Sequence, residues 1–133
     1  MSPARQMMIG IMILLSYVNF CSAEPVQDLN PCGARTITGK VIEVRQFCQV
    51  DGPCDFTVRT QDRDIFVSWG GGWTHECGNL PQIKDTGILW SIKKDDTVEV
   101  YAAVSGAAEN CPKGNQYSLR LCGSPEFYVK ILD

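Results

Sequence analysis

The chain has 133 residues, of which 12 are basic and 15 acidic, so its formal net charge is −3 at pH 7. Its length fits a single domain. Basic residues are scattered singly along an acidic chain, which argues against nonspecific nucleic-acid binding, because such binding depends on neutralising phosphates.

The first 23 residues have the order of a secretory signal peptide. Arg5 precedes an apolar run from Met7 to Val18, and a short polar segment ends at Ala23. The run is shorter than the roughly 20 residues that a transmembrane helix needs. We therefore expect cleavage after Ala23 and a secreted or periplasmic protein without a transmembrane segment. An uncleaved anchor and a lipid on Cys21 are the alternatives.

Loss of this segment leaves six of the seven cysteines, and an even number in an exported chain predicts a disulfide framework. The mature chain also loses Arg5 and then carries a net charge of −4. Two cysteine pairs flank turn-rich segments that can fold back on themselves, and elimination gives the third. The expected disulfides are Cys48–Cys54, Cys111–Cys122 and Cys32–Cys77.

From residue 36 onward, short strands alternate with turn residues, and no window shows a long helical period. In TITGKVIEVRQF (36–47) the apolar positions change parity, from Ile37 and Val41 to Ile42 and Val44, and Gly39 lies inside the run. This pattern indicates a strand that curls as barrel strands do. A hairpin follows, and an irregular segment, 79–92, has room for one helical turn. The clearest strand has Val98, Val100, Ala102 and Val104 facing inward. A long loop, a short segment QYSLRLC and a final strand FYVKIL complete the chain.

This order of strands resembles the OB-fold, a small five-stranded Greek-key barrel. The likeness rests on TGKVIEV, FTVRTQDRDIFVSW, LWSIKKDDTVEVYAAVS and YVKIL. We therefore expect an all-β, OB-like, five-stranded Greek-key barrel that is stabilised by disulfides, with a short helical or irregular plug between strands 3 and 4. The expected domains are a signal peptide at 1–23, an N-terminal extension at 24–35 and an OB-fold domain at 36–133.

The resemblance implies a ligand across the exposed face of the second and third strands, flanked by the 47–54 and 105–116 loops. The stretch SWGGGWTHECG (68–78) adds two further candidates. Its Trp69 continues the inward parity of its strand, but the two aromatic residues after the glycines have no assigned place in the core. The candidate binding residues are Arg59, Arg63, Phe66, Tyr101, Trp73 and His75.

The sequence favours no particular catalytic chemistry. His75 is the only histidine, no close cysteine pair marks a zinc site, and no nucleophile elbow surrounds Ser68. The neighbouring acids at 62–64 and 95–96 are typical of turns. We expect no cofactor, no metal and no catalytic residue.

The expected function is a non-catalytic binding module for an oligosaccharide or a protein surface, with single-stranded nucleic acid least favoured. A thermonuclease-like hydrolase is one alternative, since KKDDT resembles the Asp-Gly-Asp-Thr stretch of those exported OB-fold enzymes. That family's stretch lies in the first hairpin, whereas this one precedes the fourth strand. The other alternative is a subunit of an envelope or secreted assembly, which predicts an apolar patch or an unpaired strand edge.

Overall fold

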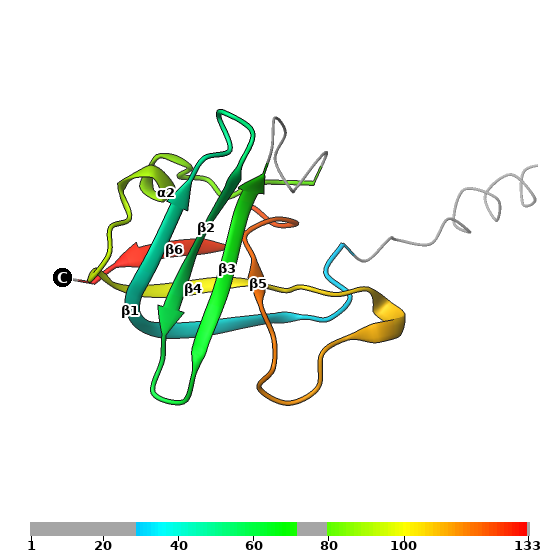
Figure 1. Cartoon of the computed structure of the whole chain (residues 1–133). Coiled ribbons are helices and arrows are strands. Elements are labelled where there is room, and N and C mark those ends of the chain that lie inside the picture. Colours follow the sequence, from blue (N-terminus) through cyan, green and yellow to red (C-terminus); the bar gives the residue numbers. More distant parts are fainter. Residues whose placement is uncertain (1–28, 72–79, 133) are drawn as a thin grey trace, which may run out of the picture.

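A computed structural model describes residues 29–71 and 80–132 (Figure 1). The expected signal peptide, together with Trp73, His75 and Cys77, lies outside these ranges. The regular secondary structure of the described part is almost entirely strands, with one short helix and one 3-10 turn. The elements are β1 (Ala34–Gln46), β2 (Pro53–Arg59), β3 (Asp64–Gly71), α2 (Gly87–Ser91), β4 (Thr97–Val104), η1 (Ala108–Asn110), β5 (Leu119–Arg120) and β6 (Tyr128–Ile131).

The long strand β1 closes the barrel because it pairs with a different neighbour along each half. Its first half, Ala34 to Lys40, runs antiparallel to β4, and its second half, Lys40 to Gln46, runs antiparallel to β2. β2 then pairs with β3, β3 runs parallel to β5, and β5 pairs with β4. The order β1-β2-β3-β5-β4 thus returns to β1, which confirms the predicted five-stranded, all-β barrel.

The last barrel strand is split into two pieces. β4 uses one edge for β1, so β5 and β6 share its other edge: Val104 pairs with Leu119, and Val100 pairs with Val129. Residues 121–127 lie between the two pieces, and Phe127 within them is buried. The short segment and the final strand expected from the sequence are therefore two parts of one barrel position.

Glycine is required at position 39, where β1 passes from β4 to β2. A Cβ atom there would overlap the backbone carbonyl of Arg59 and would lie 2.9 Å from Cγ1 of Val58. A register shift follows between Val41 and Glu43. The change of parity that the apolar pattern predicts, between Val41 and Ile42, thus lies at this register shift.

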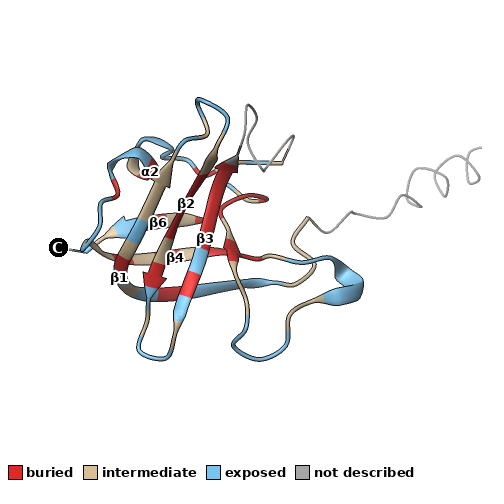
Figure 2. Ribbon diagram, viewed as in Figure 1, coloured by how far each residue is buried: buried red, intermediate tan, exposed pale blue. Residues whose placement is uncertain are grey.

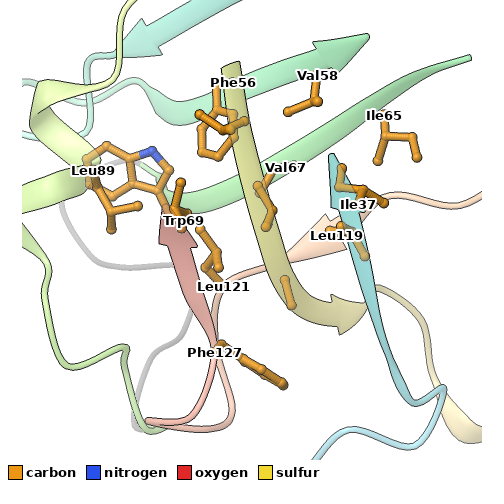
Figure 3. Close-up of a cluster of buried hydrophobic side chains, with 14 of the residues drawn as sticks. Ile37, Phe56, Val58, Ile65, Val67, Trp69, Leu89, Leu119, Leu121 and Phe127 are labelled. Atoms are coloured by element: carbon orange, nitrogen blue, oxygen red, sulfur yellow. The ribbon is translucent and has the colours of Figure 1, made fainter. Parts of the chain in front are cut away.

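The core fills the barrel interior with the inward-facing residues of each strand (Figures 2 and 3). The plug predicted between strands 3 and 4 is α2, which buries Leu89 and is followed by the buried Ile92. Trp90 remains 40% exposed and packs edge-on against Trp69, with ring centroids 4.8 Å apart. The inward residues predicted and found buried are Phe56, Val58, Ile65, Val67, Trp69, Val98, Val100, Ala102, Val104 and Val129.

Two disulfides join described residues, and only one of them was expected. Cys48–Cys54 is confirmed, but Cys32 is bonded to Cys111, so the Cys32–Cys77 and Cys111–Cys122 pairings are wrong. The physical reason is the β1–β4 ladder, because it brings the start of β1 beside the loop that follows β4.

The N–H of Val104 donates to the carbonyl of Gly33, and Cys32 therefore lies next to that loop. Cys122, in contrast, lies in the segment between β5 and β6, where its backbone forms an isolated antiparallel β-bridge with Gln82. Cys122 is itself disulfide-bonded, and its partner lies outside the described ranges. No helix within residues 29–71 and 80–132 is long and apolar enough to span a membrane.

Candidate ligand-binding face

The sequence predicts a ligand on the exposed face of β2 and β3, and in the structure the second half of β1 extends this face. Side chains alternate across a strand, so the burial of Phe56, Val58, Ile65 and Val67 turns their neighbours outward. The cross-strand registers then set the outward residues in rows. These rows are Arg45–Asp55–Ser68, Glu43–Thr57–Phe66 and Lys40–Arg59–Asp64.

A two-point ion pair fixes the first row. Nε and Nη2 of Arg45 donate to the two carboxylate oxygens of Asp55 at 2.8 and 2.7 Å. The Asp55 side chain is 5% exposed, whereas that of Arg45 is 41% exposed. The hydrogen bonds that Arg45 donates to Asp55, and then the charge of this carboxylate, raise the pKa of Arg45. The guanidinium also lies over the ring of Phe66, 5.8 Å from its centroid.

A second ion pair crosses β2 and β3 in the third row. Arg59 donates from Nε and Nη2 to the two carboxylate oxygens of Asp64, at 2.9 and 3.3 Å. Both side chains are exposed. The hydrogen bond from Arg59 lowers the pKa of Asp64, so this carboxylate stays ionised in mildly acidic solution. Each arginine of the face therefore has its own carboxylate, and neither offers an unneutralised charge to an anionic ligand.

Exposed apolar side chains lie at one position of the face and on the loop that joins β1 to β2. Phe66 is 38% exposed between the two ion pairs, and Phe47 and Val50 are 53% and 73% exposed in the loop between β1 and β2. The Cys48–Cys54 disulfide closes this loop. Hydrogen bonds from the Phe47 N–H to the Pro53 carbonyl and from the Val50 N–H to the Phe47 carbonyl support it. The loop thus presents its apolar side chains from a cross-linked turn.

The structure brings only part of the expected site together. Arg59 and Phe66 share the face, but Arg63 lies in the β2–β3 turn and donates to the backbone carbonyl of Asn115. Tyr101 lies elsewhere, on β4, where its ring centroid is 5.3 Å from that of Phe127. Trp73 and His75 lie outside the described residues.

Arg45 and Asp55 were missed from the sequence. The inward parity of Val44 and Phe56 was the signal for them, because those two residues are paired across β1 and β2 and turn their neighbours outward.

The acidic pair at 95–96, which the sequence assigned to a turn, holds the backbone there. Asp95 has a positive φ of 78°, and a carboxylate oxygen of Asp96 accepts from the N–H of Lys93 at 2.9 Å. In the part of the chain that the structure describes, no group of three or more His, Cys, Asp or Glu side chains is arranged to hold a metal ion.

No protein-family model, curated protein or solved structure matches the chain. Its function must therefore be argued from its own geometry.

Proposed function

We propose that the protein is a secreted, non-catalytic module of the OB-fold type that binds a partner protein through the outer face of β1, β2 and β3. One observation carries this proposal: exposed apolar side chains occur both on the sheet, at Phe66, and on the cross-linked loop between β1 and β2, at Phe47 and Val50. Exposed aromatic residues beside an arginine are typical of protein interfaces. Because the sheet and the disulfide already position these groups, binding costs little conformational entropy.

Charge favours a protein over a nucleic acid as the ligand. Arg45 and Arg59 are both neutralised by aspartates in their own rows. A nucleic-acid site needs cations that are free to replace the counterions of phosphate. The expected mature chain is also net negative. Electrostatic attraction toward phosphate is therefore weak on this face.

The aliphatic part of the surface favours a protein over an oligosaccharide. The rings of Phe66 and Phe47 would each serve as a stacking platform for a sugar ring. Val50 offers no flat ring and no polar group, yet it is the most exposed of the large apolar residues in the described ranges. An apolar pocket on another protein is the surface that would bury it.

The proposed module is exported and has no catalytic activity. The signal-like segment at 1–23 and the disulfides support a location outside the cytoplasm. Both aspartates of the face are engaged by arginines, and a carboxylate so engaged is a poor general acid or base near neutral pH. This argues against the hydrolase alternative.

The ligand class is tested by three parallel screens of the mature protein, against displayed folded proteins, a glycan array and single-stranded oligonucleotides. We expect reproducible ligands from the protein screen, and we expect Phe66→Ser to weaken them. A ligand found only among glycans or oligonucleotides would contradict the proposal, and so would protein ligands that bind Phe66→Ser as tightly as the wild type.

A further inference from the structure

The first half of β1 has one edge without a strand partner in the described structure. Ala34 to Gly39 pair only with β4, and pairing with β2 begins at Lys40. The sheet that runs through β6, β4 and the first half of β1 therefore stops at β1. An unpaired edge exposes backbone donors and acceptors and is a template for another strand.

The hydrogen-bond pattern identifies the backbone groups on this open edge. The N–H of Val104 donates to the carbonyl of Gly33, and that of Val41 donates to the carbonyl of Asp96, at 2.9 and 2.8 Å. Hydrogen-bonded and non-hydrogen-bonded pairs alternate in an antiparallel ladder. The backbone N–H and C=O groups of the odd-numbered residues from 33 to 41 therefore point toward β4. The residues whose N–H and C=O groups point to the open edge are Ala34, Thr36 and Thr38, and all three are exposed.

An open groove of about 440 Å³ lies beside this edge. The barely exposed Ile37 and Ile65 lie among its lining residues, and most of the others are polar. They come from β1, from the β2–β3 turn and from the loop that precedes β5. The polar lining residues are Thr36, Thr38, Thr60, Gln61, Asp62, Arg63, Asn115 and Tyr117.

The walls of the groove are held by side-chain contacts. Thr60 Oγ1 donates to the carbonyl of Arg63 at 2.9 Å and accepts from the Arg63 N–H at 3.3 Å, which closes the β2–β3 turn. Arg63 then joins this turn to the backbone of Asn115. The guanidinium of Arg35 lies over the ring of Tyr117, 5.2 Å from its centroid. The groove is therefore already formed in the free protein.

Basic residues outnumber acidic ones around the edge. Arg35 and Lys40 flank the open backbone groups, and Arg63 lies in the groove wall. The acids nearby are Asp62 in the groove wall and Glu99, which pairs with Thr38 across β1 and β4. No ion pair involving these five residues occurs within the described ranges. The local charge thus complements an acidic ligand, although the chain as a whole is acidic.

From these observations we propose that an extended, acidic segment of a partner protein binds here as an added β-strand next to β1. Its backbone pairs with Thr36 and Thr38, one side of the segment contacts the groove, and its carboxylates meet Arg35 and Lys40. This mode of recognition takes affinity from main-chain hydrogen bonds and specificity from side chains. The site shares Lys40 with the third row of the Phe66 face but does not rest on the proposed function.

A second copy of the chain fits this edge less well. Two β1 edges that paired about a twofold axis would bring the same basic residues together, and facing like charges destabilise a strand pair. In addition, the β2–β3 turn and the loop before β5 both extend past β1 on the same side (Figure 1). A single strand has less bulk than a whole barrel to place beside these loops.

The proposal is tested with a displayed library of random hexapeptides selected on the mature protein, followed by amide hydrogen exchange measured by NMR. In the free protein we expect the Thr36 and Thr38 amides to exchange at least about 100-fold faster than those of Arg35 and Ile37. Selected peptides should be rich in Asp and Glu and poor in Pro, and they should slow exchange at Thr36 and Thr38. Peptides that leave both amides unchanged, or a selection without enrichment, would overturn the proposal.

Two variants at one position separate the backbone from the side chain. Thr36→Pro removes an N–H that faces solvent, so it should abolish peptide binding while the β4-facing amides stay protected. Thr36→Ala keeps the N–H and should bind as the wild type does. Phe66→Ser should also leave peptide binding unchanged, so failure here and failure of the proposed function are distinguishable. A wild-type dimer in analytical ultracentrifugation that Thr36→Pro abolishes would instead assign the edge to self-association.

Discussion

Removing the Cys32–Cys111 disulfide is expected to lower the free energy of unfolding more than removing Cys48–Cys54. The two bridges close loops of very different length, with sequence separations of 79 and 6. A cross-link stabilises the native state mainly by restricting the unfolded chain, and the restriction grows with the logarithm of loop length. The chain-entropy relation gives about 4.5 kcal/mol for the longer loop and about 2.2 kcal/mol for the shorter one.

Packing narrows this difference without reversing it. Cys54 is fully buried, so its replacement by alanine adds a small cavity and costs about 1 kcal/mol more. Cys32 and Cys111 are only half-buried, so alanine there adds little beyond the lost cross-link. We therefore expect the Cys32→Ala/Cys111→Ala variant to lose about 4.5 kcal/mol and the Cys48→Ala/Cys54→Ala variant about 3 kcal/mol.

Urea denaturation of the oxidised variants, followed by tryptophan fluorescence, measures both losses. With a slope of about 1.5 kcal/mol/M, the midpoints should fall by about 3 M and 2 M. The reasoning would be refuted if the Cys48→Ala/Cys54→Ala variant lost as much stability as the other or more. Peptide mapping under non-reducing conditions is the control, because it shows that the remaining cysteines keep their native partners.

Three further predictions concern the bend, the ion pairs and the remaining cysteines. Gly39→Ala should cost at least about 2 kcal/mol of stability in urea denaturation because its Cβ meets backbone, whereas Gly87→Ala, whose Cβ approaches only one side-chain oxygen, should cost little. Arg59→Met should raise the pKa of Asp64 toward its ordinary value in an NMR titration. In the wild type the stabilisation from this pair should be present at neutral pH and lost as the pH falls through the lowered pKa of Asp64. Mass spectrometry of the non-reduced mature protein should find a Cys77–Cys122 disulfide, since the other four cysteines are already paired.

Strand alternation predicted the strands and most of the core, and the resemblance of their order to the OB-fold implied the barrel. In β4, strict alternation placed Val98, Val100, Ala102 and Val104 inside, and the structure buries all four. Alternation reports which face of a strand meets the core, and the core is where most of the folding free energy arises. The irregularity of β1 was equally visible, because the apolar pattern changes parity between Val41 and Ile42, where the register shifts.

Features that depend on contacts between distant segments could not be predicted from strand alternation. The cysteine pairing was inferred from nearness in sequence, which correctly paired Cys48 with Cys54 but failed for Cys32 and Cys111. Those two meet only because β1 folds back along β4. The division of the last barrel strand into β5 and β6 could not be predicted either. Both pieces are aligned by the edge of β4, and no local sequence signal joins them.

The residues of the candidate face were only half predicted for a similar reason. Phe66 and Arg59 follow from alternation within one hairpin. The ion pair of Arg45 with Asp55 requires the register between β1 and β2, and a bulge between Val41 and Glu43 shifts that register. A local pattern gives the direction of a side chain, whereas its neighbours on the adjacent strand depend on the whole barrel.

The most direct test of the proposed function compares two exposed apolar residues on different parts of the barrel. Phe66 is 38% exposed on the face, and Leu132 is 52% exposed beyond β6. Dissociation constants for a partner from the protein screen should be measured with the wild type, Phe66→Ser and Leu132→Ser. We expect Phe66→Ser to raise the dissociation constant at least about tenfold, as loss of an interface anchor does, and Leu132→Ser to leave the dissociation constant unchanged. Equal affinities for wild type and Phe66→Ser, with both variants folded, would contradict the proposed function.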